Sequence, residues 1–223
     1  EKDRLRARVV LEGYGYKFCP SQEPRELSWS DSYFKEGLPP VDLHWDITMG
    51  GRNNKRIEGL WANAKLLDKE GVRYYELMPE ELLLFLAANL SSTETTRQLR
   101  YLCDILRSIT IFNEEIEWDR VLLKAREWKL SGPLYAALNL ASAMGLANFP
   151  KGVIKKIGLP VGSRIITGIL INKRNILSPG LAVRIFDRFF SNFLFEVIVS
   201  ENMRDYAGFL KRFFYPSLNF NQF

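Results

Sequence analysis

The sequence predicts an α+β protein, in which a small antiparallel or mixed sheet at the N-terminus precedes a mainly α-helical domain. Residues 41–47 alternate between apolar and polar side chains, the period of a β-strand, whereas apolar residues in most of the later chain recur with a helical period. Gly50-Gly51 and Asn53-Asn54 are turn signals between the two patterns. We therefore predict domains at residues 1–50 and 51–223.

The N-terminal elements are predicted from short local patterns. Residues 4–12 are typical of a helix with an apolar stripe of Leu5, Val9 and Val10, and glycines end this helix before a short strand at residues 16–18. Residues 27–34 and 41–47 are expected to form an antiparallel hairpin with a turn at residues 35–37.

The later helices are predicted from apolar periodicity and from residues that favour helix ends. Pro79-Glu80-Glu81 is a favourable helix start, and Asn113 is expected to cap a further helix that passes through Trp118. Between them, Arg100 and Asp104 lie four residues apart on the polar face of a predicted helix. They form either a surface ion pair or a pair that faces substrate.

The strand at residues 41–47 carries the strongest candidate for chemistry. Asp42, His44 and Asp46 share one face, and Val41, Leu43, Trp45 and Ile47 share the other. At the usual rise of a strand, Asp42 and His44 are about 6.8 Å apart, whereas Asp46 is about 13 Å from Asp42. Asp42 and His44 can therefore share a ligand. The alternative is a half-solvated strand with incidental acids.

Composition excludes several classes of protein. Hydrophobic residues make up 47% and charged residues 26%, which is typical of a globular domain. The densest apolar segment, residues 189–199, is too short for a membrane span. One histidine excludes multi-histidine zinc sites, and the two cysteines suggest no disulfide framework. We expect a cytoplasmic protein.

The positive charge is unevenly distributed. The net charge is +5, but residues 128–184 contain eight basic residues and no acid, so the remainder carries 5 − 8 = −3. Such a region attracts anions such as nucleotide phosphates, although spread lysines can also simply solvate a helical bundle. Lys155, Lys156 and Arg164 are our candidates for nucleotide binding. No phosphate-loop pattern surrounds Gly50-Gly51.

The order of these signals resembles an uncharacterised nucleotidyltransferase-like family of bacterial proteins. The most specific match is Val41-Asp42-Leu43-His44-Trp45, and the weaker matches are Gly13-Tyr14, Leu77 with Pro79-Glu80 and Leu83, residues 100–104, Trp118-Asp119, Ala125 with Trp128, and Phe214-Tyr215-Pro216-Ser217. The resemblance covers most of the chain.

The resemblance implies a nucleotidyltransferase fold that uses Mg²⁺ to transfer a nucleoside monophosphate from an NTP to an acceptor. In this family a Gly-Ser turn and an Asp-x-Asp pair join a third acid on a later strand, and Asp42 looks like that third acid. Carboxylates that converge from neighbouring strands suit a site with two metal ions. The resemblance implies that the helical domain covers the nucleotide and acceptor.

The sequence departs from the family pattern because it contains no Asp-x-Asp. We expect the segment that carries it to lie upstream of Glu1, or the chain to be a degenerate relative. One carboxylate cannot hold two metal ions, so we predict that the 223-residue chain alone is inactive. The alternative function is a non-catalytic binding or scaffold protein that uses its basic helical surface for an anionic partner.

Overall fold

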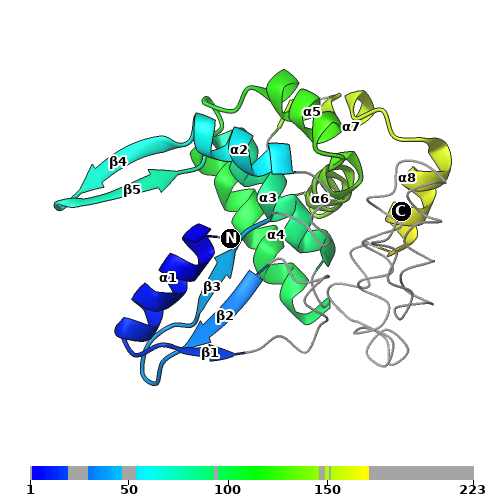
Figure 1. The fold of residues 1–223 in the computed structure, drawn as a ribbon. Coiled ribbons are helices and arrows are strands. Elements are labelled where there is room, and N and C mark those ends of the chain that lie inside the picture. Colours follow the sequence, from blue (N-terminus) through cyan, green and yellow to red (C-terminus); the bar gives the residue numbers. More distant parts are fainter. Residues whose placement is uncertain are drawn as a thin grey trace, which may run out of the picture. The chain divides into compact units, whose positions relative to one another are not determined.

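The computed structural model describes residues 2–19, 30–46, 54–92, 95–145, 149–150 and 152–170, and it confirms the α+β class (Figure 1). Contacts between residues divide the chain into two compact units, Glu1–Leu77 and Met78–Phe223. The predicted boundary at residue 50 lies outside the described residues, and the N-terminal compact unit extends beyond it to Leu77. The functional assignment of residues 51–77 stays a prediction.

The N-terminal unit contains a three-stranded antiparallel sheet in the order β1-β2-β3. Helix α1 (Lys2–Gly13) is followed by β1 (Lys17–Cys19), β2 (Ser30–Phe34) and β3 (Val41–His44). The turn between β2 and β3 has Gly37 at φ +76°, a backbone conformation that glycine adopts without steric cost. The predicted N-terminal helix, short strand and hairpin are thus confirmed, whereas residues 27–29 lie outside the described part.

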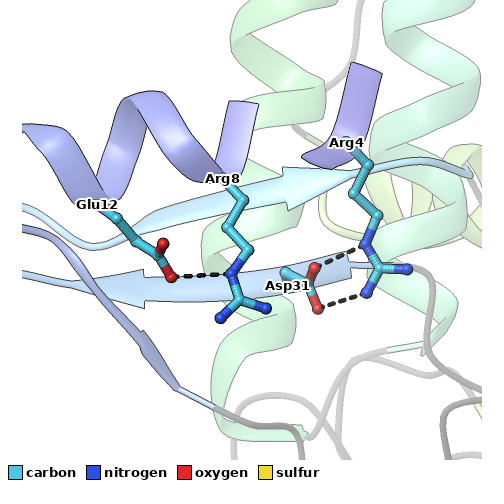
Figure 2. A network of polar contacts seen from close by, with 4 residues as sticks. All are labelled: Arg4, Arg8, Glu12 and Asp31. Carbon is cyan, nitrogen blue, oxygen red and sulfur yellow. Dashed lines mark hydrogen bonds and ion pairs between the residues drawn. The ribbon is translucent and has the colours of Figure 1, made fainter. Parts of the chain in front are cut away.

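Helix α1 contacts the sheet through arginines (Figure 2). Arg4 donates two hydrogen bonds to the carboxylate of Asp31 on β2, at 2.8 and 3.0 Å, and its guanidinium lies 3.8 Å from the centre of the Trp45 ring. The predicted apolar stripe is wrong as a buried face, because Leu5, Val9 and Val10 are all more than half exposed. A planar guanidinium both pairs with a carboxylate and stacks on an aromatic ring, so Arg4 links the helix to the sheet.

A second, two-stranded hairpin ends the N-terminal unit. Helix α2 (Asn54–Asn63) precedes β4 (Lys65–Lys69) and β5 (Val72–Glu76), which pair antiparallel. Glu70 and Gly71 both have positive φ, at 54° and 80°, as a two-residue type I′ turn requires.

The helical unit is organised around α3 (Pro79–Ser92), which contacts α4 (Thr95–Ile111), α5 (Trp118–Glu127) and α6 (Ser131–Ala143). Leu83, Leu84 and Leu90 of α3 are fully buried, as expected for a helix that is apolar on nearly every side. The short α7 (Val153–Lys156) and α8 (Val161–Leu170) follow. No helix in the described ranges is both long and apolar enough to cross a membrane.

Two glutamates at the start of α3 are buried instead of lying on the surface. Glu80 is 1% exposed, and its Oε1 accepts a hydrogen bond of 3.0 Å from the backbone N–H of Glu117, immediately before α5. The predicted Asn113 cap is therefore wrong: α5 begins at Trp118, and a carboxylate from α3 binds a free N–H at that end. Glu81 is fully buried and forms ion pairs with Lys124 and Arg120 of α5.

Replacing Tyr33 by Phe is expected to stabilise the N-terminal unit by about 1 kcal/mol, because a buried hydroxyl without a partner is costly. Tyr33 is fully buried, and its hydroxyl has no hydrogen-bond partner within the described residues. Burial, together with the negative charge of Asp31, raises the pKa of Tyr33, so the phenol is neutral at pH 7. Thermal unfolding will check this. Tyr16→Phe is the control, because the Tyr16 hydroxyl donates to the Pro39 carbonyl at 3.3 Å, and it should not stabilise. A lower melting temperature for Tyr33→Phe would contradict the assignment.

Candidate functional site

The polar face of the three-stranded sheet brings the candidate residues together. In the antiparallel register, Ser32 of β2 lies opposite Asp42 of β3, and Ser30 lies opposite His44. Asp42 and His44 are exposed, whereas Val41 and Leu43, on the other face, are half-buried. The alternation predicted for β3 is therefore confirmed over residues 41–44.

Asp42 is held by a short hydrogen bond across the two strands. The hydroxyl of Ser32 donates to Asp42 Oδ1 at 2.6 Å, a distance typical of a hydroxyl bound to an ionised carboxylate. The second oxygen, Oδ2, has no hydrogen bond within the described part of the chain. Asp42 thus combines a fixed orientation with an oxygen that is available to a ligand.

Strand β1 extends this face beyond Ser32. The register pairs Cys19 with Ser32, so Cys19, Ser32 and Asp42 form one row across the three strands. Lys17 pairs with Phe34 on the same face. The row therefore carries a thiol, a hydroxyl and a carboxylate, with an ammonium group at one end of β1.

His44 lies two residues from Asp42 on this face. Partial desolvation of the ring lowers the pKa of His44 below its usual value, and the negative charge of Asp42 opposes that shift. The net direction is downward, so the imidazole is neutral at pH 7 and offers one N–H donor and one nitrogen acceptor. A neutral imidazole at this position can hydrogen-bond a phosphate oxygen or a carboxylate.

Asp46 does not share the face predicted for it. Strand β3 ends at His44, so the alternation that would place Asp46 beside Asp42 and His44 does not continue. Asp46 is only 5% exposed, whereas a carboxylate on the polar face would be solvated. The interpretation of Asp46 as a third solvent-facing polar group of this strand is wrong.

This face supplies one side chain that is suited to binding Mg²⁺. Mg²⁺ prefers oxygen, and proteins commonly hold it with one or two carboxylates together with phosphate oxygens of the substrate. Asp42 Oδ2 meets that requirement, whereas an imidazole nitrogen such as those of His44 is a poorer ligand for this hard cation. No group of three or more His, Cys, Asp or Glu side chains suited to a metal ion occurs among the described residues.

Of the basic candidates in the helical unit, two have partners of their own. Lys156 Nζ lies 3.2 Å from the Asp119 carboxylate, and Arg164 Nε donates to the carbonyl of Leu159 at 2.9 Å. Lys155 is exposed on α7. Binding of nucleotide by Lys155, Lys156 and Arg164 stays a prediction.

Arg100 and Asp104 both lie on α4, where Arg100 is exposed and Asp104 half-buried. They do not form the surface ion pair that their spacing allows, since no ion pair joins them within the part of α4 whose side chains are described. A role facing substrate stays a prediction for both.

Ser32 is the residue of this site that sequence reasoning missed. A loop of residues 35–40 placed evenly between the two strands would set Phe34 opposite Val41 and Ser32 opposite Leu43. The observed register is shifted by one residue, pairs Tyr33 with Val41, and so brings Ser32 opposite Asp42. The loop length alone therefore does not identify Ser32.

A comparison with protein families matches the part of the chain that contains Asp42 and His44. The model of a family described as Uncharacterised nucleotidyltransferase matches residues 1–145, which contain the three-stranded sheet and helices α1 to α6. Comparison with curated proteins and with solved structures gave no match. The family match spans well over half of the 223 residues and includes Asp42 and His44. The chain therefore belongs to the uncharacterised nucleotidyltransferase family.

Proposed function

We propose that this protein is a magnesium-dependent nucleotidyltransferase, which transfers a nucleoside monophosphate from an NTP to a hydroxyl or similar acceptor. The observation that carries the proposal is Asp42, an exposed carboxylate oriented by Ser32 on a sheet that lies within the family match. The family supports nucleotidyl transfer in general. The metal, the nucleotide and the acceptor are our inference from the chemistry of this face.

In the proposed reaction the acceptor hydroxyl loses its proton to solvent and its oxygen forms a bond to the α-phosphorus, as the bond from that phosphorus to the pyrophosphate oxygen breaks. Asp42 Oδ2 would hold Mg²⁺, which supplies positive charge to the phosphate oxygens when it is bound. Asp42 would thereby help to activate the acceptor. We propose that the further carboxylates of a complete two-metal site come from outside the described residues.

His44 is proposed to assist Asp42 without acting as a metal ligand. Its neutral imidazole has an N–H that can donate to a phosphate oxygen, or it can orient Asp42 from the same face of β3. A charged imidazolium is not required for either role. Loss of His44 should therefore reduce the activity less than loss of Asp42.

The helical unit is proposed to contribute to binding of the nucleotide and the acceptor. Lys155, Lys156 and Arg164 supply positive charge that favours triphosphate, and residues 128–184 contain no acid. Asp119 of α5, which pairs with Lys156, is the carboxylate that a nucleotide phosphate would displace. Arg100 and Asp104 are proposed to face the acceptor. The cytoplasm, where NTP and Mg²⁺ are both present, is the proposed compartment.

The proposal predicts that the full-length protein releases pyrophosphate from at least one of the four common NTPs in the presence of Mg²⁺. Cell extract depleted of nucleotides would supply the acceptor, and a matched sample with EDTA would be the control, because chelation removes the metal that Asp42 would hold. Release that EDTA does not reduce would contradict the metal requirement. Salt-sensitive binding of an anionic partner without any release would favour the scaffold alternative.

A further inference from the structure

We propose that Ser32 is a positioning residue for the metal-binding carboxylate of Asp42, an inference that rests on the proposed function. Its hydroxyl donates to Asp42 Oδ1 at 2.6 Å from the neighbouring strand. Ser32 itself touches neither nucleotide nor metal in this proposal. It would act by fixing the Asp42 side chain so that Oδ2 is presented to the ion.

The register of the sheet makes this contact a fixed property of the fold. Ser32 and Asp42 are directly opposite residues in an antiparallel pair, where Cβ atoms are about 4.5–5.5 Å apart. At that separation a short hydroxyl side chain reaches a short carboxylate side chain without strain. The flanking pairs, Asp31 with Leu43 and Tyr33 with Val41, lie on the other face and hold the same register.

The hydrogen bond has a direct consequence for metal binding. An exposed aspartate turns freely about its side-chain bonds, and a bond to Oδ1 removes much of that freedom before the ion arrives. This effect acts on metal affinity, whereas the contact is exposed and should add little to folding.

A residue that orients a metal ligand typically changes affinity for the metal or activity by about 10–100-fold when it is removed. Neither neighbouring hydroxyl can replace Ser32. Ser30 is two residues along β2 and lies opposite His44, and Tyr33 points to the buried face. Ser32 is therefore the residue whose hydroxyl the Asp42 carboxylate depends on within the described sheet.

The test is binding of Mn²⁺, as a spectroscopic substitute for Mg²⁺, to the full-length protein in the presence of a non-hydrolysable NTP analogue, followed by electron paramagnetic resonance. We expect Ser32→Ala to weaken Mn²⁺ binding by about 10–100-fold and Ser32→Thr, which keeps a hydroxyl, to restore most of it. Ser142→Ala removes an exposed hydroxyl from α6 and should leave the affinity unchanged. The melting temperatures of all three variants should stay near that of the wild type.

A double-mutant comparison separates this inference from the proposed function. If Ser32 acts through Asp42, then Ser32→Ala should cause no further loss of Mn²⁺ affinity in an Asp42→Asn background. Wild-type affinity in Ser32→Ala, together with lost affinity in Asp42→Asn, would overturn the positioning role and leave the proposed function standing. Wild-type affinity in Asp42→Asn would overturn the metal assignment itself. If Ser32→Ala unfolds, failure of a folded Ser32→Thr to bind the metal would overturn the inference.

Discussion

Asp42→Asn is expected to reduce nucleotidyl transfer by the full-length protein by orders of magnitude while the melting temperature stays level. The amide keeps the size of the side chain and an oxygen that accepts the Ser32 hydrogen bond, so the strand pairing is preserved. It lacks the negative charge that attracts a divalent cation. Initial rates at saturating NTP and Mg²⁺, measured beside thermal unfolding, will check the prediction.

Two other substitutions on the same segment provide controls. His44→Gln should lose only part of the activity, because an amide retains hydrogen-bonding groups. Asp46→Asn should change stability more than activity, since Asp46 is buried and lies beyond the end of β3. An inactive Asp46→Asn beside a nearly normal Asp42→Asn would overturn the site assignment. A strongly destabilised Asp42→Asn would make Asp42 a structural residue.

Glu81→Ala is expected to destabilise the helical unit by about 3–5 kcal/mol, the second large effect that the structure predicts. The Glu81 side chain is 1% exposed, and its partner Lys124 has a side chain that is 12% exposed. Removing the carboxylate leaves the ammonium group partly buried with its partner charge lost, which costs more than the pair itself contributes. Denaturant unfolding of the wild type and the variant will give the difference in unfolding free energy.

Removal of both charges is the matched comparison for this buried pair. Glu81→Leu combined with Lys124→Met should recover much of the stability, because apolar side chains then replace these two ions in a similar volume. Arg120, the second partner of Glu81, has a side chain that is 30% exposed and can be solvated when the carboxylate is lost. Glu127→Ala, at an exposed position of α5, should change the unfolding free energy by less than about 0.5 kcal/mol. A loss below about 1 kcal/mol in Glu81→Ala would show that the ion pair is effectively solvated.

Local patterns predicted the elements well but not how they pack. The hairpin of β2 and β3 and the helix that begins at Pro79 follow from alternation, proline placement and helical periodicity. The docking of α1 does not, because it depends on a hydrogen-bonded pair between Arg4 and Asp31, which are 27 residues apart. Likewise, the backbone N–H of Glu117, at the N-terminal end of α5, donates to Glu80 of another helix. The local candidate for this cap, Asn113, therefore predicted the wrong first residue for the helix.

Residues of the candidate site could be predicted where the sequence signal lies within a single strand, and not where it depends on the pairing of two strands. Asp42 and His44 follow from the alternation of a single strand, and their exposure on one face agrees with it. The prediction that Asp46 shares this face failed because the point where a strand ends depends on its pairing partner as well as on its own sequence. Ser32 is invisible until the register between two strands is known. Whether the basic residues of the helical unit bind nucleotide depends on which distant segments lie beside them, and helical periodicity does not predict that.

The measurement that tests nucleotidyl transfer most directly compares two labelled forms of the NTP that supports pyrophosphate release. With label in the α-phosphate, the full-length protein should transfer radioactivity to an acceptor in the presence of Mg²⁺, and Asp42→Asn should not. With label in the γ-phosphate, the acceptor should remain unlabelled and the radioactivity should appear in pyrophosphate. Transfer of the γ-label, or equal transfer of the α-label by wild type and Asp42→Asn, would contradict the function and the site proposed for this protein.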